Sequence, residues 1–275
     1  MKILVTGATG FIGSNLIESL LMFDHEIIAT SRDRSKAIKK TWYKNVSFIE
    51  FNIEGDTRLN LFEYFHKPDI IIHLSWSGLP NYNSISHVEN NLWDNYYFLK
   101  NLITNGATNI TVTGTCFEYG MDNGEMFSSR VTNPSNSYSI AKDSLRKFLN
   151  ILQKENDFTL KWLRLFYLYG ENQSKHSLYY QLCNAIDNNL EYFDMSNGEQ
   201  IRDYLPIEIA VRDIIEVSLN FKGSIVKNIC SGNPISIRAF VEGIIKSKNS
   251  QIKLNLGYYK YSSFEPLAFW GNKNN

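Results

Sequence analysis

Short runs of consecutive apolar residues alternate along the chain with longer segments in which apolar residues recur at helical spacing. Uninterrupted runs of strand length are typical of strands buried on both faces of a parallel sheet, and the wider spacing is typical of helices with one buried face. The runs predict strands at 1–6, 25–30, 46–51, 68–74, 109–113, 159–166 and 225–230. The spaced segments predict helices at 57–65, 86–105, 174–189 and 211–219, and others that begin near Phe11, Ser137 and Ser236.

The alternation of strands and helices predicts an α/β protein with a doubly wound parallel sheet, the Rossmann architecture. The alternation holds to about residue 170 and weakens afterwards. We therefore expect residues 1–170 to form a Rossmann domain, with 201–235 returning to it. Residues 171–275 are expected to form mainly a small C-terminal lobe.

The composition points neither to a polyanionic partner nor to a membrane. Lys and Arg together number 28, as do Asp and Glu, so the formal net charge is zero and gives no sign of nucleic-acid or membrane binding. The longest apolar runs are too short to span a bilayer, and the first residues look like a strand rather than a signal peptide. Cys116, Cys183 and Cys230 are too far apart for a metal motif. We expect a cytoplasmic protein without a metal site.

Three glycines follow the first strand at a spacing that suits a diphosphate. Gly7 would allow the tight turn out of the strand, Gly10 would let the backbone approach a pyrophosphate, and Gly13 would let the next helix pack close to the sheet. Free N–H groups at the start of this helix would face the phosphates. An ordinary glycine turn would show the same three residues, but the strand before and the helix after favour a dinucleotide site. The cofactor contacts expected here are Gly7, Thr9, Gly10, Phe11, Ile12 and Gly13.

The end of the second strand indicates which nicotinamide dinucleotide such a fold would take. An acidic residue there bonds the 2′-hydroxyl of NAD, whereas a small or basic residue accommodates the 2′-phosphate of NADP. Ser31 and Arg32 favour NADP(H), but Asp33 follows directly and keeps NAD(H) open. Further cofactor contacts are expected from Asn52, Ile53, Leu74, Ser75, Trp76 and Asn91.

Tyr138 and Lys142 are four residues apart on a predicted helix, so both side chains lie on one face. A free tyrosine has a pKa of about 10, and a nearby ammonium would favour its phenolate. Tyr138 could then exchange a proton with a carbonyl or alcohol oxygen, while Thr115 orients that oxygen. A solvated helix face would show the same spacing, but the glycine turn favours catalysis. The catalytic residues expected are Thr115, Tyr138 and Lys142, and the last two are also expected to contact the cofactor.

With these residues in view, the sequence resembles the extended short-chain dehydrogenase/reductases, specifically their nucleotide-sugar epimerase/dehydratase/reductase group. The resemblance covers nearly the whole chain. It implies a nicotinamide-dependent oxidoreductase that acts on a CH–OH or keto group, a substrate-binding role for the C-terminal lobe, and a homodimer paired through the helix at 86–105 and the helix that bears Tyr138. The motifs that carry it are 6–13, 68–74, Asn91, 115–120, Pro134, Asn136, Tyr138, Lys142, 163–170 and 202–204.

Departures from the family pattern narrow the reaction that the resemblance implies. Family 4,6-dehydratases carry Asp-Glu directly after the active-site threonine, where this chain has Cys116 and Phe117, so dehydration is not expected. The stretches 114–120 and 264–271 resemble a subset that uses NADPH to reduce dTDP- or CDP-linked 4-keto-6-deoxy sugars for surface polysaccharides such as O-antigen. An NAD-dependent nucleotide-sugar 4-epimerase is the alternative, and a non-catalytic NADP(H)-binding redox sensor is a third hypothesis. The aromatic tail is expected to pack on the small lobe. The substrate contacts implied are Thr115, Cys116, Phe117, Tyr167 and Arg202.

Some side chains are open to two interpretations. Arg202 is expected to reach the diphosphate of a sugar nucleotide, as in relatives, and an ion pair with Asp203 or Glu208 is the alternative. Family geometry would place Arg164 over the nicotinamide. His73 is expected to be a core histidine rather than a catalyst.

Overall fold

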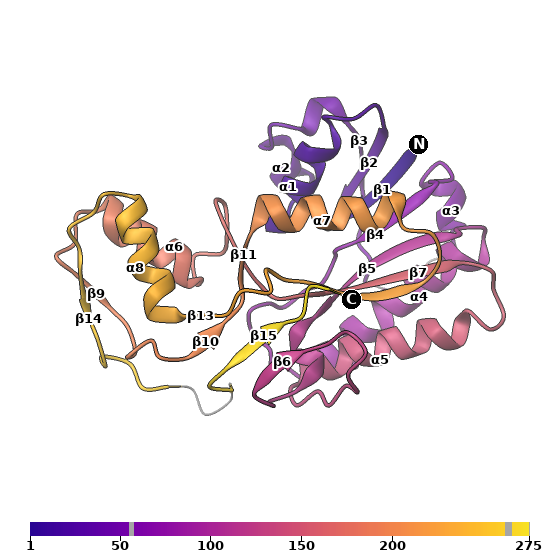
Figure 1. Cartoon of the computed structure of the whole chain (residues 1–275). Coiled ribbons are helices and arrows are strands. Elements are labelled where there is room, and N and C mark those ends of the chain that lie inside the picture. Colours follow the sequence, from indigo (N-terminus) through magenta and orange to yellow (C-terminus); the bar gives the residue numbers. More distant parts are fainter. Residues whose placement is uncertain (55–57, 262–265, 275) are drawn as a thin grey trace.

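A seven-stranded parallel sheet forms the centre of the molecule (Figure 1). The computed structural model describes residues 1–54, 58–261 and 266–274. The strand order is β3-β2-β1-β4-β5-β7-β12, and each neighbouring pair is parallel. This order confirms the doubly wound sheet, because the chain winds outward in both directions from β1. The strands are β1 (Lys2–Thr6), β2 (Glu26–Ser31), β3 (Ser47–Glu50), β4 (Ile70–His73), β5 (Asn109–Thr115), β7 (Thr159–Leu165) and β12 (Ile225–Ile229).

Helices cover both faces of the sheet (Figure 1). On one face, Leu16 and Ile17 of α1 share a core with Ile214 of α7. On the other, Leu99 of α4 shares a core with Leu145 of α5. The helices are α1 (Phe11–Leu20), α2 (Arg34–Ile38) and α7 (Ile207–Asn220) on the first face, and α3 (Leu61–Tyr64), α4 (Leu92–Thr104) and α5 (Ser137–Leu152) on the second. Short helical turns are η1 (Tyr43–Asn45), η2 (His87–Asn91) and η3 (Cys116–Tyr119).

A smaller lobe has its own apolar core, in which Leu182, Phe193 and Val241 are buried. Tyr179 and Phe240 of the lobe share one cavity with Gly7 after β1, so the lobe faces the carboxyl ends of the central strands. Ligands of doubly wound sheets bind at this edge. The lobe contains α6 (Leu178–Asp187), α8 (Ile237–Ser247), β9 (Tyr192–Asp194) and β14 (Lys253–Asn255). It is joined to the sheet through β8 (Tyr167–Tyr169), β10 (Ile201–Arg202), β11 (Tyr204–Pro206) and β13 (Ile235–Ser236).

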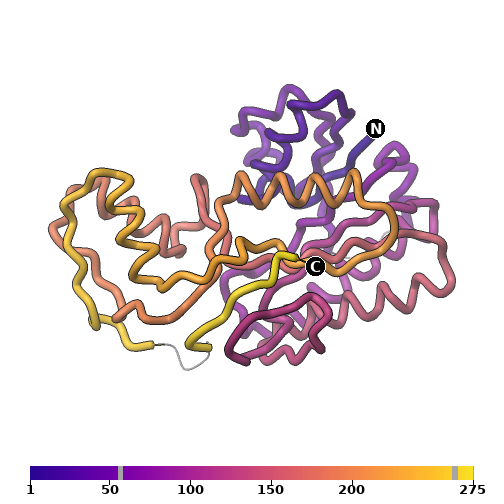
Figure 2. The backbone as a smooth tube through the Cα atoms, viewed as in Figure 1, coloured from indigo at the N-terminus to yellow at the C-terminus, as the bar shows by residue number. Residues whose placement is uncertain are grey.

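The C-terminal tail returns from the lobe to the large domain. β15 (Phe269–Gly271) pairs in parallel with β6 (Gly124–Met126), and Figure 2 shows the yellow end of the chain running back beside the magenta segment. The Asn228 side chain donates hydrogen bonds to the carbonyl oxygens of Met126 and Asn272. The expectation that the aromatic tail packs on the small lobe is therefore wrong for residues 269–272. Residues 264 and 265 of that motif lie outside the described residues.

Several helix ends differ from the predicted ones because of capping side chains. Asn60 caps α3 and Ser177 caps α6, so both helices begin later than expected, and Thr57 lies outside the described residues. α5 is capped by Asn136 and not by Ser137, since the Asn136 side chain accepts from the Ser139 amide. The helix expected at 86–105 begins with a π-turn, η2. No helix within the described part of the chain is long and apolar enough to cross a bilayer.

Candidate active site

The turn between β1 and α1 has the geometry that a dinucleotide phosphate requires. Gly7 has a φ of +66°, in the left-handed region that favours glycine. A Cβ at Gly13 would lie 2.3 Å from the Gly7 carbonyl oxygen, so only glycine lets α1 start this close to the turn. Gly10 is the N-cap of α1 and offers no capping side chain, so the first N–H groups of the helix are left for a ligand. The turn, which also contains the half-buried Thr9, fits a pyrophosphate.

The end of β2 presents a serine and an arginine where the adenosine ribose would lie. The guanidinium of Arg32 forms an exposed ion pair with Glu54, with 2.8 Å between Nη1 and Oε1. The Asp33 carboxylate accepts a hydrogen bond from the Lys36 amide and so caps α2. Asp33 is thus engaged with its own helix, whereas Ser31 is small and leaves room beside Arg32.

The other expected cofactor contacts are divided between the cavity and its surroundings. Leu74 lines the cavity, and the Ser75 amide donates to the Thr6 hydroxyl. The Asn52 side chain accepts from the Glu54 amide. Ile53 packs against the core shared by α4 and α5. Contacts of Asn52 and Ile53 with an adenine remain a prediction.

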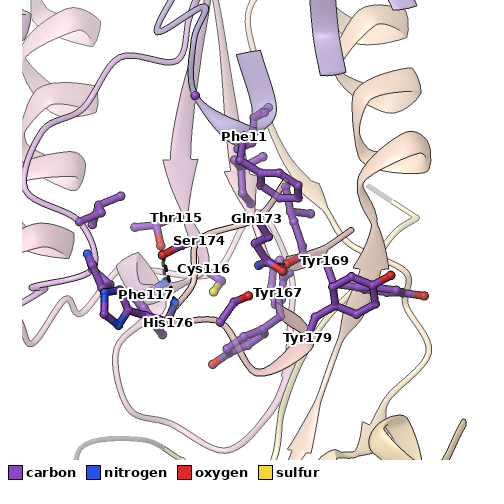
Figure 3. A pocket seen from close by; sticks show the side chains of 18 of the residues that line it. Phe11, Thr115, Cys116, Phe117, Tyr167, Tyr169, Gln173, Ser174, His176 and Tyr179 are labelled. Atoms are coloured by element: carbon purple, nitrogen blue, oxygen red, sulfur yellow. Dashed lines mark hydrogen bonds between the residues drawn. The ribbon is translucent and has the colours of Figure 1, made fainter. Parts of the chain in front are cut away.

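A cavity of about 760 Å³ lies between the carboxyl edge of the sheet and the lobe. Figure 3 shows Phe11 from the glycine turn, the residues that follow β5, and tyrosines from β8 and α6 converging on this space. Of the sequence-predicted site residues, it brings together Gly7, Gly10, Phe11, Ile12, Gly13, Leu74, Thr115, Cys116, Phe117, Tyr138 and Tyr167. Residues 173–174 and 176–179 also line it, and sequence reasoning did not identify them as part of the site.

The expected catalytic residues meet at the inner end of this cavity. Tyr138 and Thr115 both line it, and their hydroxyl groups are close enough to interact. Lys142 lies one turn beyond Tyr138 on α5. Its ammonium donates to the Thr113 carbonyl at 2.9 Å and lies 4.0 Å from the centre of the Trp76 ring. Lys142 is 2% exposed and is not among the residues that line the cavity.

Burial dominates the acid–base properties of this pair. It raises the pKa of Tyr138 well above its usual range, Tyr82 and Glu118 add to the rise, and the hydrogen bond from Thr115 opposes it. Burial lowers the pKa of Lys142 to about 7, against the opposing attraction of Glu118. The expectation of an unusually acidic Tyr138 is wrong for the chain by itself, because burial raises the pKa of the phenol more than neighbouring groups lower it. At neutral pH Tyr138 is a protonated phenol.

A buried ion pair supports the loop that carries Thr115. The Glu118 carboxylate accepts from the Thr115 amide at 2.9 Å and from Arg164 Nε at 2.7 Å. The Trp162 indole donates to the same carboxylate. The expectation that Arg164 lies over the nicotinamide is therefore wrong, because its guanidinium is held inside the fold by Glu118. Sequence reasoning missed Glu118, and its position three residues after Thr115 in a capping box was the available signal.

Arg202 does not pair with Asp203. The Asp203 carboxylate accepts from the amides of Ser231, Gly232 and Gly271. Arg202 is 1% exposed, donates to the Ile201 carbonyl, and lies with its guanidinium carbon 5.5 Å from the centre of the Tyr167 ring. Tyr167 lies between Arg202 and the cavity. A contact of Arg202 with a diphosphate remains a prediction.

His87 is a buried residue of the site that sequence reasoning missed. Its Nε2 donates to the Asn81 carbonyl, and its Nδ1 accepts from the Trp76 indole at 3.1 Å and from the Asn91 side chain at 3.0 Å. Its ring lies 5.5 Å from that of Tyr138. The π-turn of η2 brings His87 and Asn91 to the same side of the helix. Asn91 therefore supports the site through His87.

His73 is the buried core histidine that the sequence predicts. Its Nε2 donates to the Asn95 side chain at 2.7 Å, and its Nδ1 accepts from the Thr6 hydroxyl at 3.0 Å. The Asn95 amide donates to the Asn91 carbonyl, which fixes the orientation of that amide. Burial, with a contribution from Lys142, lowers the pKa of His73 to about 3. The imidazole thus stays neutral and acts as a structural bridge.

Comparisons with known proteins agree with this geometry. A family model described as "NAD dependent epimerase/dehydratase family" matches residues 3–222. The chain is 30% identical over 274 residues to dTDP-6-deoxy-L-talose 4-dehydrogenase (NAD(+)) of Aggregatibacter actinomycetemcomitans, with 99% of this chain and 100% of that protein covered. It is 26% identical over 259 residues to dTDP-4-dehydro-6-deoxyglucose reductase of Escherichia coli, with 88% of this chain and 80% of that protein covered.

A solved structure shares the fold over the whole chain. UDP-glucuronic acid 4-epimerase from Bacillus cereus, in complex with NAD, aligns with a TM-score of 0.82 at 22% identity, and the alignment covers 100% of this chain and 88% of that one. At this identity the likeness concerns the fold.

In the described part of this chain, no group of three His, Cys, Asp or Glu side chains is arranged to hold a metal ion.

Proposed function

The chain belongs to the NAD-dependent epimerase/dehydratase family, as the sequence resemblance predicts, and from this premise we propose that it is an NADPH-dependent reductase of a nucleotide-linked sugar. The substrate is a dTDP- or CDP-linked 4-keto-6-deoxyhexose, reduced at C4 in deoxysugar biosynthesis for a surface polysaccharide. The observation that carries the proposal is the buried, protonated Tyr138 phenol, which lines the cavity together with Thr115. The names of the two relatives above support the substrate class.

The chain's own residues supply orientation and a proton. The bound nicotinamide would supply hydride chemistry at the sugar carbon. Thr115 orients the keto oxygen, and the Tyr138 hydroxyl donates its proton to that oxygen. The Lys142 ammonium, one helical turn away, stabilises the phenolate that remains until a solvent proton replaces the one transferred. A phenol that is protonated at neutral pH suits reduction, whereas oxidation of an alcohol would first require its deprotonation.

Dehydration is not proposed, because the loop after Thr115 lacks the acid–base pair that it requires. Cys116 is 4% exposed and packs against Tyr119 and Phe166. Phe117 is apolar, and the Glu118 carboxylate is held by Arg164 away from the cavity. We therefore propose Cys116 as a packing residue that also forms cavity wall.

The cofactor preference for NADP(H) rests on Ser31 and Arg32. In the Ser31→Asp variant, a carboxylate would repel a 2′-phosphate and bond a 2′-hydroxyl instead. We expect the ratio of kcat/KM for NADPH to that for NADH to fall by about tenfold or more, the effect of one charged contact. Asp33→Asn keeps the cap of α2 and removes its charge, so this control should leave the ratio unchanged. A ratio that responds to Asp33→Asn and not to Ser31→Asp would contradict the assignment.

The reaction is tested by mixing the purified protein with NADPH and dTDP- or CDP-4-keto-6-deoxyglucose. We expect the absorbance of the reduced nicotinamide to decay in step with the appearance of one 6-deoxyhexose stereoisomer. If cofactor stays bound through purification and sugar converts without net NADPH consumption, the 4-epimerase alternative is correct. If cofactor binds but no keto sugar turns over, and Tyr138→Phe binds it equally well, the redox-sensor hypothesis replaces both.

A homodimer in the cytoplasm forms part of the same proposal. Trp93 and Tyr97 on α4 are 41% and 57% exposed, and Ile140 on α5 is 40% exposed. Large apolar side chains gathered on two helices are typical of a subunit interface. Light scattering should give twice the chain mass, and Trp93→Glu together with Tyr97→Lys should give a monomer. A monomeric parent protein would refute the dimer.

A further inference from the structure

Trp76 contacts both members of the Tyr138–Lys142 pair. Its indole face lies 4.0 Å from the Lys142 ammonium, and its edge meets the Tyr138 ring with 5.9 Å between ring centres. It lies three residues after the end of β4, at the carboxyl edge of the sheet. Sequence reasoning treated it as a cofactor contact, but Trp76 is not among the side chains that line the described cavity.

The Trp76 indole is itself held in place from its other edge. Its Nε1 donates to His87 Nδ1 at 3.1 Å, and the two rings stack with their centres 6.3 Å apart. His87 Nε2 donates to the Asn81 carbonyl, which fixes the tautomer that leaves Nδ1 free to accept. The backbone carbonyl of the next residue, Tyr82, accepts a hydrogen bond from the Tyr138 amide. The same unit therefore braces the start of α5.

The environment of Lys142 shows why such support is needed. The ammonium is 2% exposed, and its hydrogen bond is to the neutral Thr113 carbonyl. The titratable groups that interact with it are Glu118 from η3 and His73 from β4, and Tyr138 lies one turn before it on α5. Glu118 already forms an ion pair with Arg164, and the His73 imidazole is neutral. The face of an indole attracts a desolvated cation, so the Trp76 ring compensates part of the cost of burying this charge.

We propose that Trp76, oriented by His87, is a positioning residue that keeps the Lys142 ammonium charged and in place beneath Tyr138. Its role in turnover rests on the proposed function. Its effect on Lys142 does not, because the indole and the ammonium are in contact in the protein alone. Trp76 acts through Lys142 and takes no part in proton or hydride transfer.

The first test uses the protein without cofactor or substrate. The difference in fluorescence between the parent protein and Trp76→Phe isolates the emission of Trp76, and we expect it to titrate near pH 7, where Lys142 loses its charge. In Lys142→Met that titration should vanish. A titration that persists in Lys142→Met would originate from a group other than Lys142 and would overturn the proposal, as would an emission that does not change with pH. The result of this fluorescence test does not depend on which substrate the enzyme uses.

The second test follows the pH dependence of reduction. The charged form of Lys142 is the active one, so kcat/KM is lost as pH rises through the lysine pKa. In Trp76→Leu that loss should move to lower pH by about one unit, a tenfold change in the protonation equilibrium, and kcat at neutral pH should fall with KM for the sugar little changed. Trp76→Phe keeps an aromatic face and should restore most of the profile.

Matched controls separate this effect from simple loss of packing. Trp42 is a buried tryptophan whose Nε1, like that of the half-buried Trp76, donates one hydrogen bond, in this case to Ser14. It packs in the core with α1, on the opposite face of the sheet from α5. Trp42→Phe should lower thermal stability comparably and leave the pH profile unchanged. The positioning role is refuted if Trp42→Phe, Trp76→Phe and Trp76→Leu all give the same pH profile. Should Trp76→Leu fail to fold, His87→Gln carries the comparison, and an unshifted pH profile in His87→Gln overturns the proposal.

Discussion

The Glu118 carboxylate accepts a 2.7 Å hydrogen bond from Nε of Arg164, and neither side chain is more than 2% exposed. The same carboxylate accepts from the Thr115 amide. One buried ion pair therefore links the end of β7 to the loop that presents the oxygen-orienting threonine.

Removing one member of this pair should be much worse than removing both. Arg164→Met leaves Glu118 as a buried charge and should destabilise the fold by about 3–5 kcal/mol. The double variant Arg164→Met with Glu118→Leu should recover part of that loss. Urea unfolding of the two single variants and the double variant measures the coupling, and strictly additive losses would show that the pair is not coupled.

Tyr138→Phe removes the proposed proton donor and preserves the ring contacts. We expect kcat for reduction to fall by about 10²–10⁴-fold, because proton transfer to the keto oxygen is lost. Binding of the reduced cofactor, followed by fluorescence titration, should change little. Tyr64→Phe on α3, an exposed tyrosine remote from the cavity, is the matched control. Full activity in Tyr138→Phe would remove the tyrosine from the mechanism.

Gly13→Ala should abolish cofactor binding while Gly243→Ala does not. A methyl group at Gly13 would lie 2.3 Å from the Gly7 carbonyl oxygen, so the turn must move away from its phosphate-binding shape. At Gly243 on α8 the added carbon meets nothing within 4 Å, and alanine should stabilise the helix by up to about 1 kcal/mol. Calorimetry with NADPH tests binding, and wild-type affinity in Gly13→Ala would contradict the assigned turn.

Lys142→Met should change how stability depends on pH. Burial lowers the pKa of Lys142 to about 7, below its unfolded value of 10.5. Between these values the unfolded chain binds one more proton than the folded one, so this group makes the parent protein more stable as pH rises from 7 towards 10. In Lys142→Met that increment should be missing. Melting temperatures of both proteins at pH 6, 7, 8 and 9 measure it, and parallel curves would show that Lys142 is not desolvated.

Local sequence patterns determined the architecture and the first elements of the site. Uninterrupted apolar runs predict the parallel strands because both faces of such a sheet are buried. The glycine spacing predicts the turn after β1, and the four-residue spacing places Tyr138 and Lys142 on one face of α5. These features depend on residues close together in the chain, where backbone geometry alone decides which side chains are neighbours.

Tertiary structure decided what surrounds that pair. Glu118 meets Arg164 across 46 residues, and His87, which lies in the π-turn η2, meets Trp76 across 11 residues. The return of the tail beside β6 opposes the expected packing on the lobe, and the capture of Arg164 inside the fold opposes what the family resemblance implied. Burial of Tyr138 and Lys142 likewise follows from how distant segments pack, and it reverses the pKa shift that proximity alone suggests for the tyrosine. Desolvation depends on the whole three-dimensional environment of a group, which residue spacing does not contain.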